Sequence, residues 1–282
     1  MGDWAKVSVV VPCYNSHQYL GQTLESIRAQ TYPNIEVVIV DDGSNDPATI
    51  AFLDALPSDV IRVRQSNRGL PAARNAGIAT ASGEYILPLD TDDWLEPEAV
   101  SCLLEALESS PDFVFSFATI QMEGEASGVL VKQFNRFEQL FLNQLPYCIM
   151  YRKGKWTEAG GYDESMRSGY EDWEFNIRLS ALGNGVRVPK PLFHYRVQAS
   201  GMLLSKSSRL HQDLWNGIRK KHRSWYSLTS LFQLWRKWRG EPSTYPLWTY
   251  FPWMACCMVL PAPIFRKIFE FLRQFSQRHR VS

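Results

Sequence analysis

The chain has 282 residues, of which 45% are hydrophobic and 21% charged, as in folded globular proteins. This composition excludes a collagen-like or a largely disordered chain. The 30 Lys and Arg residues nearly balance the 29 Asp and Glu residues, so the overall charge gives no support for nucleic-acid binding, and we expect none.

Charge and aromatic content divide the chain near residue 201. Residues 202–282 contain 14 Lys and Arg but 3 Asp and Glu, together with 6 of the 10 Trp. Residues 1–201 contain 16 Lys and Arg and 26 Asp and Glu. We therefore predict one domain over 1–201 and a basic, aromatic-rich helical region over 202–282. The five scattered cysteines lack metal or disulfide spacing and the first residues lack a signal peptide's apolar stretch, which favours a cytoplasmic location.

Strand-like and helix-like patterns alternate in the first part of the chain. Apolar, β-branched runs at 7–11, 36–40, 60–63 and 85–89 are typical of strands buried on both faces. Helical patterns begin at Asn15-Ser16 and continue over 47–56 and 71–81. The alternation predicts an α/β fold with a mostly parallel sheet flanked by helices, whose ligand crevice lies beyond the carboxyl ends of the strands.

The later elements follow a less regular pattern. We predict a helix over 98–109, a strand over 113–120, a helix that carries Phe175 to Leu182, and helical structure over 206–240. Residues 245–265 form an uncharged run that four prolines interrupt, and 264–280 have the pattern of an amphipathic helix.

Polar residues stand where the predicted strands end. The ends of the first, second and fourth strands and the loop after the third carry Pro12-Cys13-Tyr14-Asn15, Asp41-Asp42-Gly43-Ser44, Asp90-Thr91-Asp92-Asp93, and Asn67-Arg68-Gly69 followed by Arg74. The sequence contains neither the glycine fingerprint of nicotinamide-binding domains nor a P-loop, so we exclude both classes.

Three carboxylates within four residues, those of Asp90, Asp92 and Asp93, repel one another unless a cation or protons neutralise them. Asp90 and Asp92 point to one side of an extended chain, where they suit a Mg²⁺ or Mn²⁺ ion that also takes phosphate oxygens. The alternative is a helix cap, because an acidic residue also stabilises the N-terminus of the helix that follows.

The motifs VSVVVPCYN, VVIVDDGS, NRGLPAARNAG and GEYILPLDTDD come in this order, followed by GGYDE and GYEDWEF. As a set, over about residues 6–200, they resemble the family-two glycosyltransferases, which have the GT-A fold. The resemblance implies a metal-dependent, inverting transfer from a nucleotide-sugar donor, for which we favour a uridine diphosphate sugar. The implied acceptor is a glycan or a lipid-linked compound in cell-surface polysaccharide synthesis.

The resemblance implies a donor site at the strand ends. It places Tyr14 against the nucleotide base, Asp42 on the base or ribose, and Arg74 near the base or the phosphates. Asp90 and Asp92, a D-x-D motif, would contact the ribose and the cation, with Asp93 as a further ligand. The rest of the implied nucleotide site is Pro12, Asn15, Asn67 and Gly69. The plainer alternatives are packing for Tyr14, a turn for Asp42 and a helix-surface cation for Arg74.

The GYEDWEF motif resembles the family's acceptor region. Glu171 and Asp172 would face the acceptor, one of them as the general base on its hydroxyl, and we favour Asp172. Trp173 either stacks on a sugar face or belongs to the core. Family members often carry a His after a Tyr-Arg pair, whereas here that position holds Gln198, a poor metal ligand. His194 either compensates or is structural.

The basic C-terminal region predicts a peripheral membrane contact through 241–282, at the inner face of the cell membrane. The alternatives are a bilayer span by 245–265 and a helical subdomain that packs on the catalytic domain. Residues 233–237 depart from the QxxRW signature of processive synthases, which favours single addition. The rival to an enzyme is a non-catalytic nucleotide-sugar-binding scaffold that recruits a synthase, against which the intact acidic residues argue.

Overall fold

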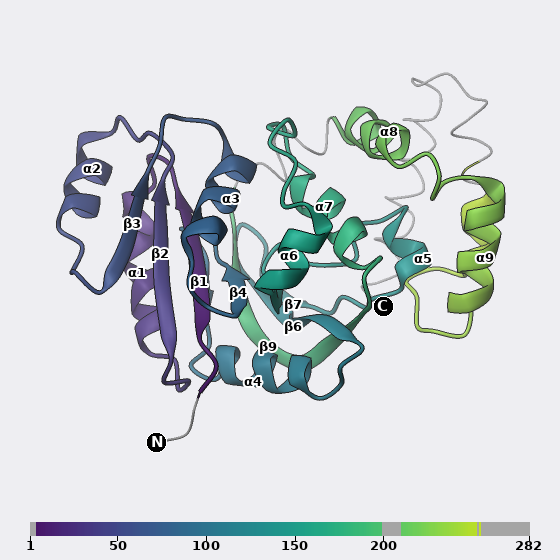
Figure 1. The fold of residues 1–282 in the computed structure, drawn as a ribbon, viewed down its shortest axis with the longest axis horizontal. Coiled ribbons are helices and arrows are strands. Elements are labelled where there is room, and N and C mark those ends of the chain that lie inside the picture. Colours follow the sequence, from purple (N-terminus) through teal and green to yellow (C-terminus); the bar gives the residue numbers. More distant parts are fainter. Residues whose placement is uncertain (1–3, 199–209, 253, 255–282) are drawn as a thin grey trace.

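The computed structural model describes residues 4–198, 210–252 and 254. Strands and helices alternate along it as the sequence predicts, with ends that differ by a few residues (Figure 1). The strands are β1 (Val7–Cys13), β2 (Ile35–Asp41), β3 (Val60–Arg64), β4 (Tyr85–Pro88), β5 (Trp94–Leu95), β6 (Phe113–Gly124), β7 (Gly128–Leu130), β8 (Met150–Arg152) and β9 (Asn184–Val197). The helices are α1 (His17–Arg28), α2 (Pro47–Asp54), α3 (Leu70–Thr80), α4 (Ala99–Glu108), α5 (Arg136–Gln139), α6 (Lys153–Ala159), α7 (Glu171–Leu179), α8 (His211–Lys221) and α9 (Leu228–Trp238), followed by the 3₁₀ turn η2 (Leu247–Thr249).

The first four strands form the parallel half of the sheet, in the order β3-β2-β1-β4. All seven residues of β1 are buried, because the strand is covered on both faces. The carboxyl ends of these strands lie at one rim, so the acidic and polar segments that follow β1, β2 and β4 meet there.

The second half of the sheet is mixed. β8 runs antiparallel to both β4 and β6, β9 runs parallel to β6, and β5 and β7 add antiparallel pairs at β9 and β6. The predicted α/β fold with flanking helices is confirmed, and the parallel pattern is concentrated in the first four strands. Strands as short as β8, with three residues, carry too little periodicity to be recognised in the sequence.

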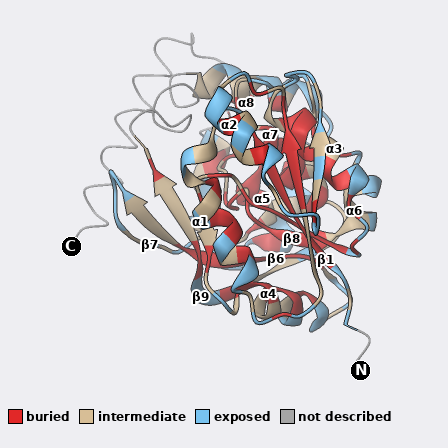
Figure 2. Ribbon diagram, turned by 90° about the vertical axis from the view of Figure 1, so that its left-hand side faces the viewer, coloured by how far each residue is buried: buried red, intermediate tan, exposed pale blue. Residues whose placement is uncertain are grey.

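Helices cover the two faces of the sheet, and the side chains of β1 alternate between them. Val9 packs in a core shared with α1, α2 and α4, whereas Val10 packs in a second core shared with α3 and α7. Figure 2 shows the buried residues gathered along the strands and on the helix surfaces that meet them. This sandwich holds the strand ends, and hence the rim, in fixed positions.

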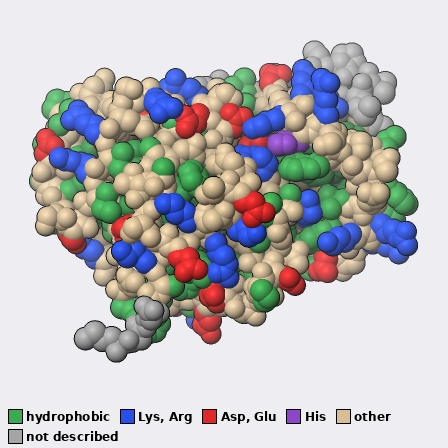
Figure 3. Space-filling model, in the orientation of Figure 1, with side chains coloured by type: hydrophobic (Ala, Val, Ile, Leu, Met, Phe, Trp, Pro, Cys, Tyr) green, Lys and Arg blue, Asp and Glu red, His purple; other side chains and the backbone are tan. Residues whose placement is uncertain are grey.

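The C-terminal helices α8 and α9 pack on α5 and α7 rather than standing apart. Trp215 and Ile218 of α8, together with Leu231 and Trp238 of α9, join an apolar cluster that includes Phe137. Helices α8 and α9 therefore agree with the alternative prediction, a helical subdomain that packs on the rest of the protein. The sequence predicts helical structure over 206–240, and the described residues 210–240 form two helices. In Figure 3 hydrophobic and basic side chains lie over α9 at the right of the molecule.

Only part of the predicted membrane segment lies in the described residues. Leu247, Tyr250 and Met254 are buried against the protein, and the carboxylate of Glu138 accepts hydrogen bonds from the amides of Thr244 and Tyr245. Within 4–198, 210–252 and 254, no helix is long and apolar enough to cross a membrane. The predicted amphipathic helix over 264–280 and the predicted domain boundary at 201 lie outside the described residues.

The carboxylate of Glu174 joins α7 to α8. It is fully buried and contacts Arg178 one turn later, at 2.6 Å, and Lys221 and His222 of α8, at 2.7 and 2.8 Å. Burial disfavours its charge, but the hydrogen bonds from His222, Arg178 and Lys221 outweigh burial and lower the pKa of Glu174 to about 2. The ionised carboxylate therefore stabilises the junction between the two regions.

We predict that Glu174→Gln lowers the free energy of unfolding at pH 7 by about 3 kcal/mol, because it removes the charge that pairs with Arg178 and Lys221. Since the folded pKa lies below the usual 4.5, the wild type loses this contribution as the pH falls from 4.5 towards 2. Urea unfolding at pH 7 and at acid pH measures both effects, and the two proteins should converge in acid. As a control, Glu158→Gln removes an exposed pair with Lys155 and should change stability by less than about 1 kcal/mol. Equal losses in the two variants would contradict the role of Glu174.

Candidate active site

The guanidinium of Arg74 connects the two sides of the rim. The side chain is 1% exposed, and it donates to Asp90 after β4 at 2.9 and 3.1 Å and to Glu171 at the start of α7 at 2.8 Å. The rings of Tyr147 and Tyr162 lie 5.1 and 5.6 Å from its central carbon. Burial opposes its charge, yet Asp90 and Glu171 outweigh burial and raise the pKa of Arg74. Arg74 is thus an internal cross-link, not the helix-surface cation of the plainer alternative.

The three acids after β4 have different surroundings. Asp93 is buried, and its two oxygens accept from the Tyr147 hydroxyl at 2.5 Å and from the amide of Arg196 at 2.7 Å. Burial and the charge of Asp92 raise the pKa of Asp93. Both oxygens of Asp93 are therefore engaged inside the protein, which does not fit the expected further metal ligand.

Asp90 and Asp92 are partly exposed at the rim. One oxygen of Asp92 accepts from the side-chain amide of Gln198 at 2.7 Å. Burial and the neighbouring charge of Asp90 raise the pKa of Asp92 to about 6. Within the described residues, no group of three or more His, Cys, Asp or Glu side chains is arranged to hold a metal ion. A cation here would have two carboxylates and would complete its shell with water and phosphate oxygens, as Mg²⁺ and Mn²⁺ sites do. The donors present fit that case.

The contacts of His194 are those of a structural residue, as the second of the two predictions for it expects. It lies on β9 opposite Trp94, on which its ring stacks with centroids 4.8 Å apart, and its Nε2 lies 2.7 Å from the carboxylate of Glu96. Gln198, at the position where the family often has His, is the residue that contacts Asp92.

The carboxylate of Asp42 organises the loop after β3. Its oxygens accept from the Gln65 side chain at 2.7 Å and from the amides of Arg68 and Gly69 at 2.9 and 2.8 Å. Asp42 is buried, and these three hydrogen bonds go to the loop, as the alternative of a turn residue expects. The loop that Asp42 holds forms part of the same rim.

Other residues of the predicted nucleotide site surround this loop. Tyr14 is 47% exposed and presents its ring at the end of β1, while Pro12 is buried within the strand. The side chain of Asn15 accepts from the amides that follow β2, and the side chain of Asn67 accepts from Arg167 at 3.0 Å. Tyr14 therefore presents an exposed aromatic ring next to these loop contacts.

Gly69 permits the close approach of two loops. Its φ of 91° lies in the left-handed region, and a Cβ there would come 2.9 Å from Nε of Arg167. The segment before α7 can therefore lie directly against the loop after β3.

Glu171 and Asp172 differ in exposure. Glu171 is buried beside Arg74, and burial raises its pKa to about 7 against the effect of that cation. Asp172 is partly exposed and accepts from the amide of Trp173 at 2.7 Å and from the side chain of Asn143 at 3.2 Å. This difference favours Asp172 as the acid that reaches a substrate.

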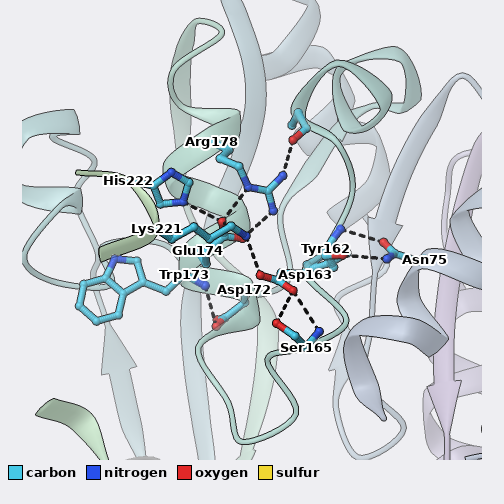
Figure 4. Close-up of polar contacts among 11 residues, drawn as sticks. Asn75, Tyr162, Asp163, Ser165, Asp172, Trp173, Glu174, Arg178, Lys221 and His222 are labelled. Atoms are coloured by element: carbon cyan, nitrogen blue, oxygen red, sulfur yellow. Dashed lines mark hydrogen bonds and ion pairs between the residues drawn. The ribbon is translucent and has the colours of Figure 1, made fainter. Parts of the chain in front are cut away.

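Figure 4 shows the ring of Trp173 and the carboxylate of Asp172 pointing in different directions from the first turn of α7. Trp173 is 1% exposed, and its indole N–H donates to the carbonyl of Gln139 at 2.7 Å. The prediction of a sugar-stacking Trp173 is therefore wrong, and the core alternative holds.

Several residues around the site were not predicted from the sequence: Asn143, Tyr147 and Arg196, which contact the acids, and Lys132. Lys132 donates to the carbonyls of Asn143 and Leu145, both at 3.1 Å, and burial lowers the pKa of Lys132 to about 8. Arg196 lies in β9 and the other three lie outside helices and strands, and no local pattern in the sequence indicates which groups they contact.

Comparison with known proteins identifies this arrangement. Residues 8–165, more than half of the chain, match the sequence profile described as glycosyl transferase family 2. The chain belongs to this family. Membership of a glycosyltransferase family supports the predicted enzyme over the alternative of a non-catalytic scaffold.

Curated relatives of this family 2 glycosyltransferase include two from different bacteria. Glycosyltransferase GlyA of Streptococcus pneumoniae is 41% identical over 104 residues, which are 36% of this chain and 15% of GlyA. The uncharacterised glycosyltransferase YwdF of Bacillus subtilis is 33% identical over 194 residues, 65% of this chain and 71% of YwdF. The chain thus spans a small part of GlyA and about two thirds of YwdF.

Solved structures of glycosyltransferases share the fold. The Staphylococcus aureus TarS structure in complex with UDP superposes with a TM-score of 0.57 at 24% identity, over 69% of this chain and 61% of that chain. Mannosyltransferase PcManGT of Pyrobaculum calidifontis, in complex with GDP-Man and Mn²⁺, superposes with a TM-score of 0.54 at 16% identity. The superposition covers 98% of this chain and 86% of that chain. These likenesses confirm the GT-A architecture.

We predict that Arg74→Met lowers the free energy of unfolding by about 3–5 kcal/mol, because it leaves the carboxylates of Asp90 and Glu171 without their cation. The matched variant Arg62→Met breaks an exposed pair with Asp54 and should lose less than about 1 kcal/mol. Urea unfolding followed by tryptophan fluorescence measures both. If Arg74→Met is no less stable than Arg62→Met, Arg74 is not the cross-link described here.

Proposed function

We propose that this glycosyltransferase transfers a sugar from a nucleoside diphosphate donor to a hydroxyl of a glycan or lipid-linked acceptor, with inversion, in cell-surface polysaccharide synthesis. The observation that carries the proposal is the placement of one partly exposed acid, Asp172, across the rim from Asp90 and Asp92. Arg74 joins the two sides through Glu171 and Asp90. A base for the acceptor and carboxylates for the donor therefore face one site.

In this proposal Asp172 acts as the general base. Asn143 and the amide of Trp173 hold its carboxylate, and its remaining lone pairs accept the proton of the acceptor hydroxyl. The bond from that oxygen to the anomeric carbon forms as the bond to the diphosphate breaks, so the nucleoside diphosphate leaves with the electron pair. Direct displacement of this kind inverts the anomeric configuration.

The donor side rests on the strand ends. Tyr14 offers an exposed aromatic face to the base, and the loop that Asp42 holds forms the adjacent wall. Asp90 and Asp92 would hold a Mg²⁺ or Mn²⁺ ion, which would supply positive charge to the departing diphosphate. Gln198 orients Asp92 through its side-chain amide. We favour uridine diphosphate as the leaving group, as in the TarS complex.

We also propose that 1–201 forms the catalytic domain and that 202–282 holds the enzyme at the inner face of the cell membrane through 241–282. The support is the 14 Lys and Arg against 3 Asp and Glu in this region, with Phe232 and Trp248 exposed beside α9 and η2. Aromatic and basic side chains together suit the headgroup layer of an anionic membrane.

We predict that Asp172→Asn lowers the turnover rate by about 10²–10⁴-fold, because asparagine cannot accept the acceptor's proton. The donor-induced rise in melting temperature should persist, since Asp172 lies on the acceptor side. Initial rates with a panel of nucleotide sugars, together with thermal shift, separate the two effects. Asp213→Asn, on the exposed surface of α8, is the matched control and should keep full activity. Full activity of Asp172→Asn would refute its role as the base.

We predict that Asp92→Asn raises the Mn²⁺ concentration for half-maximal activity by at least about tenfold, because one of two carboxylate ligands is lost. Chelation of divalent cations should abolish transfer in the wild type. The control Asp59→Asn changes the net charge by the same amount at an exposed position. It should need the same Mn²⁺ concentration as the wild type for half-maximal activity. Wild-type activity in the presence of excess chelator would exclude the cation.

A further inference from the structure

A cavity of about 220 Å³ lies between α7 and the C-terminal helices, away from the rim. Ile177 and Ser180 form its wall at the end of α7, Trp225 lies between α8 and α9, and Lys237 belongs to α9. Ser180 is eight residues after Asp172, which puts it about 12 Å further along the helix axis. The cavity is therefore separate from the proposed transfer site.

Two cations and no acid line this cavity. Arg136, at the start of α5, and Lys237 supply the charges, and the polar side chains of Ser230 and Gln233 lie beside them. Across 4–198, 210–252 and 254, no hydrogen bond or ion pair joins the side chain of Arg136 or Lys237 to a protein acceptor. Within the described part of the chain, two positive charges thus gather at one cavity without an acidic partner.

Arg136 is the more unusual of the two, because it is half-buried. Withdrawal from water lowers the pKa of its guanidinium, and no carboxylate offsets that effect. Arg74 and Arg178, which are also withdrawn from water, each contact carboxylates at 2.6–2.9 Å. Because no described residue supplies such a partner, this half-buried guanidinium is a candidate contact for a bound anion.

We propose that this cavity binds a phosphate group, with Arg136 and Lys237 as its cationic contacts. A phosphate carries between one and two negative charges at neutral pH, which matches the two cations. The fork of Arg136 donates two parallel hydrogen bonds, and the ammonium of Lys237 donates a third. The indole of Trp225 provides an apolar wall for the group that carries the phosphate.

The phosphate has two chemical sources, a phospholipid headgroup or a soluble phosphorylated compound. Leu228 and Phe232 are exposed on the helix that carries Lys237. If a lipid headgroup occupied the cavity, these two apolar side chains would be available to contact the acyl chains of the lipid. A soluble compound would use the cavity alone. Membrane vesicles therefore distinguish the two sources.

The test is isothermal titration of the full chain with inorganic phosphate, without divalent cations or donor. We expect binding by the wild type and at least about a tenfold loss of affinity in Arg136→Gln/Lys237→Gln, because charge-assisted contacts are removed. The matched control Arg223→Gln/Arg236→Gln removes two exposed charges nearby and should change affinity less than about twofold. Asp172→Asn should bind as the wild type does, so failure of the proposed transfer chemistry does not affect the outcome.

Flotation with phosphatidylcholine vesicles, with and without phosphatidylglycerol, is the second arm. If the cavity variant loses binding to the anionic vesicles and the matched control retains it, the source is a lipid headgroup. If vesicle binding is unchanged while phosphate affinity falls, the source is soluble. Where the double variant does not fold, Lys237→Glu reverses an exposed charge and should also abolish phosphate binding. Undetectable binding by the wild type, or equal affinity in the cavity variant and the control, overturns the proposal.

Discussion

The arrangement of the site depends on one buried guanidinium. Removing the charge of Arg74 from water is strongly unfavourable unless anions surround it, and the chain supplies two, one at the end of β4 and one at the start of α7. Arg74 and Glu171 are 97 residues apart in the sequence, so their contact fixes how the parallel half of the sheet meets the later helices. The electrostatic requirement of one side chain thereby sets the distance between the proposed donor and acceptor groups.

The first turn of α7 gives four consecutive residues four separate tasks. Glu171 faces Arg74, Asp172 is left partly exposed, Trp173 enters the apolar cluster with α8 and α9, and Glu174 meets the cations of α8. Successive residues on a helix point about 100° apart, which makes this division possible. The candidate base therefore sits on a helix held from three sides, and its carboxylate has little freedom to move.

Much of the fold could be predicted because it follows local rules. Continuous apolar runs marked the strands of the parallel half, and the rule that ligands lie at the carboxyl ends of strands located the rim. What could not be predicted is which hydrogen-bonding atoms the protein uses itself. Asp42 and Asp93 look as available in the sequence as Asp172, yet their oxygens are taken by Gly69 and by Arg196. Such partners come from folding, since Arg196 follows Asp93 by 103 residues.

The acidic triplet after β4 shows how the fold gives like residues unlike properties. Three adjacent carboxylates cannot all stay ionised without compensation. Arg74 neutralises Asp90, and burial with two donors secures Asp93 inside the protein. Burial and the charge of Asp90 raise the pKa of Asp92 to about 6, against the opposing effects of the Gln198 amide and the charge of Arg196. The remaining need for positive charge is therefore greatest at Asp92, which is partly exposed at the rim.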